Sequence, residues 1–150
     1  MPVRKLSEPS AHGRILLVDD NWNGLKARKS VLEEHGHRIT MARGGEEALD
    51  VFSRQKFELV ITDYQMPGMD GLELISRLRK QSPEAPIILL SGFVDSLGFS
   101  QENTGADCVI QKSANEVQHL VRAVSRLLQP KNAKKPASGE RGLKAQRKAV

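Results

Sequence analysis

The sequence has a single cysteine, Cys108, so its 150 residues cannot close an internal disulfide bond. It also lacks any apolar run near the roughly 20 residues that span a membrane. The start of the chain has no apolar core of the kind that marks a secretory signal. These absences argue against a disulfide-stabilised secreted domain and against a membrane-spanning protein. They favour a protein of the reducing cytoplasm, in which Cys108 is a small buried strand residue.

Most of the chain also lacks a net positive charge, although the formal net charge of the whole chain is +5. Residues 130–150 carry seven Lys or Arg side chains and one acidic residue. The other 129 residues, with 16 basic and 17 acidic groups, have a net charge of about −1. We therefore divide the chain into a flexible leader (1–13), one domain (14–129) and a basic, disordered tail (130–150). Arguments about partners that rest on positive charge apply only to this tail.

The domain contains a regular alternation of two patterns. Short apolar runs typical of buried parallel strands alternate five times with segments whose apolar residues repeat at helical spacing. In the first helix the expected apolar stripe is Trp22, Leu25 and Leu32. The fourth helix, within 92–105, should be poor because Gly98 lies in its middle. We predict an α/β fold with a doubly wound parallel sheet and five helices, and with strands at 14–18, 37–42, 57–62, 86–91 and 106–111.

Local signals predict how two of the helices begin. Asp70 precedes the third helix, and Glu73 follows it at the spacing of a reciprocal capping box. Ser113 and Glu116 have the same spacing before the last helix. In such a box, the first side chain accepts a bond from the backbone of the second residue, and the second side chain returns one. We expect a reciprocal cap at both places.

Polar residues follow four of the five predicted strands: Asp19 and Asp20, then Asp63, Ser91 and Lys112. Because ligands collect at the carboxyl ends of strands in open α/β sheets, we expect these groups to converge. Three carboxylates so close together would repel one another unless a cation neutralises them, and hard oxygen ligands suit Mg²⁺. A lysine and a hydroxyl facing the metal can bind an anionic group. This set of groups predicts a phosphoryl-transfer site.

Each of these residues also has an ordinary interpretation. An aspartate after a strand often caps a helix or forms a turn, and a lysine after an edge strand can simply be solvated. Their joint occurrence at the ends of four strands favours the functional interpretation. A metal-dependent phosphatase fits poorly, because Gln65 stands two residues after Asp63 where a second aspartate would act as acid and base. A nucleotide-binding protein also fits poorly, since no glycine-rich loop follows the first strand.

The motifs that carry these residues resemble the receiver domain of bacterial two-component response regulators. The matching segments are 15–20, the block Asp63-Tyr64-Gln65-Met66-Pro67-Gly68-Met69-Asp70-Gly71, then 90–92, and 105–107 leading to Lys112. The resemblance covers about residues 13–129. It implies a flavodoxin-like fold with strand order 2-1-3-4-5 and five helices.

The resemblance also implies a metal site and its ligands. Asp20 and Asp63 would bind Mg²⁺ directly, and the backbone carbonyl of Gln65 would be a third ligand. Asp19 would hold a water molecule on the metal.

The same resemblance implies that Asp63 is the phospho-acceptor. It would take a phosphoryl group from a sensor histidine kinase or a histidine phosphotransfer protein. Ser91 would hydrogen-bond one phosphoryl oxygen, and Lys112 would pair with another. The protein would then be no conventional enzyme, but a phospho-acceptor that assists its own Mg²⁺-dependent phosphorylation and dephosphorylation.

Three features depart from the family pattern. Val109 stands where the family usually has an aromatic residue, and Ser113 stands where it usually has a proline after a cis peptide. A non-proline cis bond is costly, so Lys112–Ser113 is expected to be trans. The fourth helix contains Gly98. We infer that phosphorylation acts by ordering residues 92–104; the alternative is that Val109 is merely tolerated.

No stretch after Leu128 is long enough for a DNA-binding or catalytic domain, so the sequence predicts a stand-alone receiver. It would signal by binding an unidentified downstream protein or as a phosphorelay intermediate. The alternative is that the basic tail contacts nucleic acid or an anionic surface as the output. The tail has no aromatic residues to stack on bases, and a solvated tail is favoured.

Overall fold

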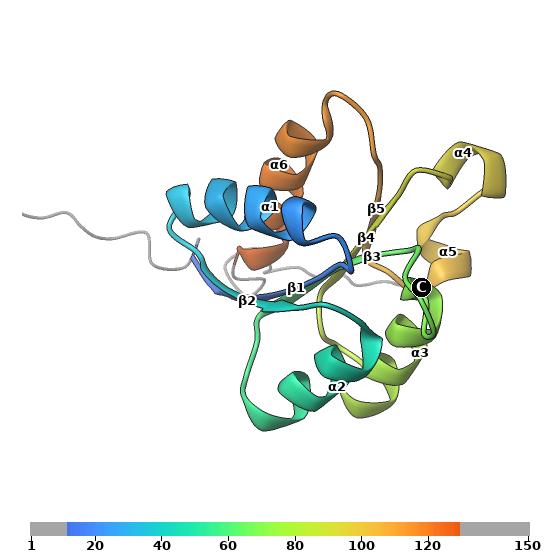
Figure 1. Cartoon of the computed structure of the whole chain (residues 1–150), viewed down its shortest axis with the longest axis horizontal. Coiled ribbons are helices and arrows are strands. Elements are labelled where there is room, and N and C mark those ends of the chain that lie inside the picture. Colours follow the sequence, from blue (N-terminus) through green and yellow to red (C-terminus); the bar gives the residue numbers. More distant parts are fainter. Residues whose placement is uncertain (1–11, 130–150) are drawn as a thin grey trace, which may run out of the picture. The chain divides into compact units, whose positions relative to one another are not determined.

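The computed structural model describes residues 12–129, which form a five-stranded parallel sheet with helices on both faces (Figure 1). The strand order is β2-β1-β3-β4-β5, so the predicted fold class and strand order are confirmed. The strands are β1 (Arg14–Val18), β2 (Arg38–Ala42), β3 (Leu59–Asp63), β4 (Ile87–Ser91) and β5 (Cys108–Gln111). All neighbouring strands are parallel, so their carboxyl ends meet at one edge of the sheet.

Two apolar cores, one on each face of the sheet, hold the layers together. Successive side chains of a strand point to opposite faces. Ile15 and Leu17 therefore pack towards α1 and α6, whereas Leu16 and Val18 pack towards α2 and α3. Burial on both faces explains why β1, β3 and β4 are nearly continuous apolar runs. The helices are α1 (Trp22–Glu34), α2 (Gly45–Arg54), α3 (Gly71–Gln81), α4 (Val94–Leu97), α5 (Gln101–Thr104) and α6 (Glu116–Leu128).

The prediction of five helices is wrong by one, because the segment 92–105 holds two short helices instead of one poor helix. Gly98 ends α4 in the left-handed conformation, with φ +66°, which a residue with a Cβ rarely adopts. Ser100 then starts α5 with a complete capping box to Asn103. The glycine that weakens a single helix thus acts as the break between two.

The capping box predicted at Asp70 is wrong in its second half, and the one predicted at Ser113 is wrong in both halves. Asp70 does cap α3 by accepting a bond from the backbone of Glu73, at 2.9 Å. The side chain of Glu73, however, pairs with Arg77 one turn later. Before α6, Ser113 accepts a bond from the backbone of Asn115, and the side chain of Glu116 reaches α1 instead. An acidic side chain near a helix start takes a cationic partner where one is within reach.

Trp22 is not part of the buried stripe of α1, since its side chain is 41% exposed and lies under the guanidinium of Arg43. Leu25 and Leu32 are fully buried as predicted. Cys108 is half-buried on β5, so it is less enclosed than predicted. The peptide between Lys112 and Ser113 is trans, like every other peptide bond of the described chain.

The predicted leader, apart from residues 12 and 13, and the predicted tail lie outside the described residues. Among the described residues, no helix is long and apolar enough to cross a membrane.

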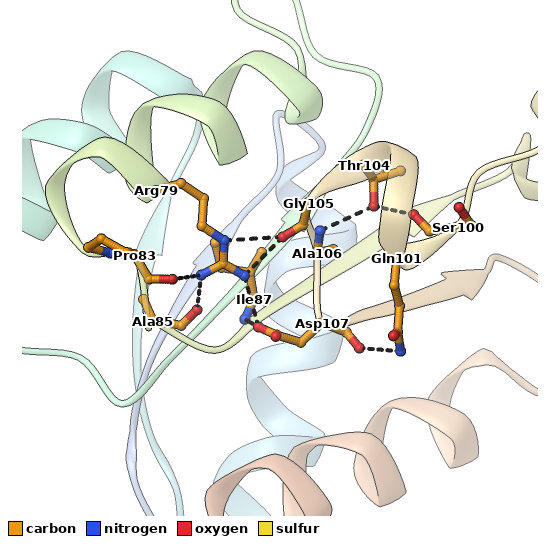
Figure 2. Close-up of polar contacts among 10 residues, drawn as sticks. All are labelled: Arg79, Pro83, Ala85, Ile87, Ser100, Gln101, Thr104, Gly105, Ala106 and Asp107. Atoms are coloured by element: carbon orange, nitrogen blue, oxygen red, sulfur yellow. Dashed lines mark hydrogen bonds and ion pairs between the residues drawn. The ribbon is translucent and has the colours of Figure 1, made fainter. Parts of the chain in front are cut away.

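Arg79 organises the other end of the sheet, at the amino ends of β4 and β5 (Figure 2). Its guanidinium pairs with Asp107 at 3.0 Å, and Asp107 also accepts a bond from the backbone of Ile87. Gln101 of α5 donates to the carbonyl of Asp107. These bonds tie the end of α3 to α5 and to the start of β5. The guanidinium also donates to the carbonyls of Pro83, Ala85 and Gly105.

Replacing Arg79 with alanine should lower the free energy of unfolding by about 2 kcal/mol, because several backbone carbonyls lose a charged donor together. Urea unfolding measures this loss. Arg77→Ala is a matched control on the same helix, since it removes only an exposed ion pair to Glu73 and should cost about 0.5 kcal/mol or less. Equal losses in the two variants would show that the Arg79 contacts do not anchor this end of the sheet.

Candidate functional site

All the site residues predicted from the sequence line one cavity of about 640 Å³ at the carboxyl edge of the sheet. Each comes from the end of a strand or from the loop that follows it, as parallel pairing requires. The cavity also includes parts of the loops after β1, β3 and β4. The predicted residues that line it are Asp19, Asp20, Asp63, Gln65, Ser91 and Lys112.

The pairing of β1 with β3 brings the two buried carboxylates together. Val18 lies opposite Thr62, so the next residues along the chain, Asp19 and Asp63, reach the edge side by side. The loop after β3 then turns back sharply, with the backbone of Gly71 donating to the carbonyl of Tyr64 at 2.7 Å. A Cβ on Gly71 would collide with the Asp63 carbonyl oxygen and lie 2.9 Å from the Tyr64 Cα. Glycine at this position therefore lets α3 begin directly beside the site.

The carboxylates of Asp19, Asp20 and Asp63 form a cluster whose oxygens lie within 4.8 Å of one another. Asp19 and Asp63 are only 2% and 5% exposed, whereas Asp20 is exposed to solvent. Burial raises the pKa of Asp63; its bond to Lys112 opposes that shift, and the nearby charge of Asp19 adds to it. Three hard oxygen donors beside an open cavity fit a Mg²⁺ ion, which keeps several of its waters.

Lys112 provides a cation that contacts this carboxylate cluster at Asp63. Its ammonium pairs with the Asp63 carboxylate at 2.5 Å, and its backbone N–H donates to the carbonyl of Ser91 at 2.8 Å. Ser91 lies opposite Gln111 in the β4–β5 register, so Lys112 follows directly at the edge. The register of the last two strands therefore sets the position of both Ser91 and Lys112.

Ser91 links the site to the loop that begins α4. Its hydroxyl oxygen accepts a bond from the backbone of Phe93 at 2.9 Å, which leaves the hydroxyl proton free to donate into the cavity. The side chain of Gln111 holds the same loop, because it donates to the carbonyl of Gly92 and accepts from the backbone of Asp95. Gln111 was not predicted from sequence as a site residue. The available signal was its position at the end of β5, directly before Lys112.

Aromatic side chains gather next to the site on the loop side rather than on β5. Tyr64, which follows Asp63, lies edge-on to Phe99 with ring centroids 4.8 Å apart and to Phe93 at 6.5 Å. Val109, the position that lacks the expected ring, is half-buried on β5. Phe93 is 41% exposed. The two rings that lie against Tyr64 therefore belong to the segment between β4 and β5.

Arg28 is a second residue that sequence reasoning missed. Its guanidinium bonds to Asp19 at 2.8 Å, although it projects from α1, where only apolar residues were expected to face inward. Leu25, Arg28 and Leu32 share the buried face at spacings of three and four. The sequence signal for this buried arginine was a cationic residue at the spacing of the apolar stripe.

Comparison with known proteins decides the family. The family model described as "Response regulator receiver domain" matches residues 15–125. The chain belongs to this family. It is 34% identical over 123 residues to the "Probable transcriptional regulator ycf27" of Cyanidium caldarium, covering 80% of this chain and 49% of that protein. It is 31% identical over 134 residues to the "Gliding motility regulatory protein" of Myxococcus xanthus, covering 83% and 17%.

Solved structures of receiver domains match over their full length. The response regulator TrrA from Thermotoga maritima, solved in complex with Mg(2+)-BeF, is 38% identical with a TM-score of 0.69, covering 76% of this chain and 97% of that one. The Francisella response regulator 1452 receiver domain is 29% identical with a TM-score of 0.71 and 99% coverage of that chain. The receiver domain spans only half or less of the curated relatives that it matches.

Asp63→Asn should raise the melting temperature at neutral pH without Mg²⁺, because burial and the charge of Asp19 raise the pKa of Asp63 and disfavour its ionised form in the folded protein. A raised pKa means that this penalty is full above the folded pKa and disappears below the ordinary value near ~4. The advantage of the variant, measured by thermal unfolding, should therefore shrink as the pH falls towards that value. A variant less stable than the parent at neutral pH would contradict this electrostatic account.

Proposed function

We propose that this receiver domain accepts a phosphoryl group on Asp63 from the phosphohistidine of a sensor histidine kinase or a histidine phosphotransfer protein. The observation that supports this most is the position of the Asp63 carboxylate, buried between two carboxylates and the ammonium of Lys112 and open to one cavity. That arrangement can bring a dianionic group to Asp63 and neutralise its charge on both sides.

In the proposed step, one oxygen of the Asp63 carboxylate attacks the phosphorus atom of the donor. The phosphorus–nitrogen bond breaks, a phosphorus–oxygen bond forms, and the electron pair stays on the imidazole nitrogen, which takes up a proton. Lys112 leaves the carboxylate and pairs with a phosphoryl oxygen. Ser91 donates its free hydroxyl proton to another phosphoryl oxygen, an arrangement that its bond from Phe93 already allows.

The residues that would hold Mg²⁺ in this proposal are Asp20, Asp63 and the backbone carbonyl of Gln65, with Asp19 acting through a water molecule. When bound, the ion supplies positive charge that offsets the carboxylates and the arriving phosphoryl group. Asp20 is the exposed member of the cluster, so it can meet an incoming ion first. Asp19 is buried, and the backbone of Asn21 fixes its orientation by donating to Oδ1 at 3.0 Å.

The protein would act in the cytoplasm, where histidine kinases present their phosphohistidine. It would not turn over a substrate as an enzyme does, but would assist its own Mg²⁺-dependent phosphorylation and dephosphorylation. Its output would be the binding of a downstream protein or the transfer of the phosphoryl group along a phosphorelay. Several relatives are named as transcriptional regulators, which supports a role in signalling to a further component.

Incubation with acetyl phosphate and Mg²⁺ should give the parent protein one acid-labile phosphoryl group, seen as a mass increase, and should give Asp63→Asn none. Asp50→Asn serves as the matched control, because Asp50 lies exposed on α2 and its ion pair among the described residues is with Arg54. It should be labelled like the parent. Undiminished labelling of the Asp63→Asn variant would show that Asp63 is not the phospho-acceptor.

We further propose that phosphorylation is read out by the segment 92–104. Its second half is already anchored: α5 has its capping box, its first residue donates to the carbonyl of Asp107, and Gly105 at its end accepts from Arg79 (Figure 2). Its first half is four residues of helix with a mostly exposed surface, held by Ser91 and by the side chain of Gln111. Because Gly98 separates the halves, we expect α4 to respond while α5 stays in place.

Hydrogen exchange should therefore show increased protection of residues 92–98 when beryllofluoride and Mg²⁺ are added, with little change over 101–105. The reason is that a group held by Ser91 and Lys112 restrains the loop that carries Phe93. Asp63→Asn under the same conditions is the control and should not respond. Unchanged protection across the whole segment in the parent protein would refute this readout.

A further inference from the structure

A buried arginine lies behind the carboxylate cluster and joins it to a distant helix. The side chain of Arg28 is only 10% exposed. Its Nη1 donates to Asp19 Oδ2 at 2.8 Å, and its Nε donates to Glu116 Oε2 at 2.7 Å. Arg28 comes from α1, Asp19 follows β1, and Glu116 is the first residue of α6. One guanidinium therefore connects the proposed metal site with the start of the helix that follows Lys112.

A glycine in α1, which is a poor helix former, leaves the space that this ion pair occupies. Gly24 lies in the first turn of α1, and a Cβ there would sit 3.1 Å from Arg28 Nη1 and 3.3 Å from Asp19 Oδ2. Glycine is a poor helix former, so its presence in α1 is explained by the close approach of this ion pair. Burial alone lowers the pKa of Arg28, but the bonds and charges of Glu116 and Asp19 outweigh it and raise that pKa. The arginine is therefore a permanent cation.

Arg28 engages the same carboxylate that would face the ion. Asp19 uses Oδ1 to accept from the backbone of Asn21 and Oδ2 to accept from Arg28. Its charge is thus already offset before any metal arrives. Glu116 in turn offsets part of the charge of Arg28, because its side chain is only 13% exposed and lies against the guanidinium. The field at the cluster therefore depends on a residue of α6.

We propose that the positive charge of Arg28, acting through Asp19, limits the Mg²⁺ affinity of the site and couples that affinity to the first turn of α6 through Glu116. This inference rests on the proposed Mg²⁺ site. A positive charge behind the cluster opposes a second cation, and Glu116 weakens that opposition. Occupancy of the site and the position of α6 are then linked, since a linkage between two sites is reciprocal.

Two variants should move the Mg²⁺ affinity in opposite directions. Arg28→Met removes the competing charge and should lower the dissociation constant by about three- to tenfold. Glu116→Gln removes the carboxylate that offsets part of the Arg28 charge, so this variant should raise the dissociation constant for Mg²⁺ by about two- to fivefold. If Arg28 served only to orient Asp19, its removal would weaken binding instead. Arg28→Lys keeps the charge and should stay close to the parent.

The measurement is a Mg²⁺ titration of the full chain, followed by calorimetry and by the fluorescence of its single tryptophan, Trp22. Lys29→Met is the matched control, since it removes an exposed ion pair to Glu33 on the same helix and should leave the affinity unchanged. Circular dichroism without Mg²⁺ checks that each variant is folded.

Should Arg28→Met fail to fold because Glu116 is left buried and unpaired, the double variant Arg28→Met/Glu116→Gln removes both charges and keeps the test open. It should also bind Mg²⁺ more tightly than the parent. In addition, the Glu116→Gln effect should shrink in the Arg28→Met background, which a double-mutant cycle measures.

Weaker or unchanged binding in the folded variants that lack Arg28 would overturn the inference while leaving the proposed function intact. Failure of the parent chain to bind Mg²⁺ would overturn the inference and the metal site together. Loss of the proposed phospho-acceptor role would appear separately, as normal labelling of Asp63→Asn.

Discussion

Two carboxylates of like charge, Asp19 and Asp63, are buried side by side at the carboxyl edge of the sheet, and the site is arranged around this repulsion. Parallel pairing of β1 with β3 leaves them no other place. Two cations offset this repulsion: Lys112 pairs with Asp63, and Arg28 pairs with Asp19. A charge balance of this kind is sensitive to any further ion, which suits the proposed binding of Mg²⁺ and of a phosphoryl group.

The sequence was enough to predict the sheet and the convergence of polar groups, because both depend on local patterns. Strands buried on both faces must be apolar runs, and the residue after such a run must lie at the sheet edge. The strand order came from the family resemblance, since the pattern alone does not order parallel strands. The comparisons and the observed topology agree with that resemblance.

What the sequence did not predict depends on contacts between distant residues. Glu116 follows Ser113 at the spacing of a capping box, yet its side chain pairs with Arg28, which is 88 residues away. Arg28 had no predicted role, although its spacing from Leu25 placed it on the buried face of α1. Arg79 likewise binds partners from two loops, one before β4 and one before β5, that only the fold brings together (Figure 2). In each case a long side chain finds its partner across elements, and no local motif records that.

The central claim of this account is that the carboxylate of Asp63 forms the acyl phosphate. The most direct measurement is to phosphorylate the parent protein with acetyl phosphate and Mg²⁺, reduce the acyl phosphate with borohydride, and locate the reduced residue by peptide mass spectrometry. The account predicts reduction at Asp63 alone. Reduction at Asp19 or Asp20 instead, or no reduced residue in a chain that binds Mg²⁺, would contradict it.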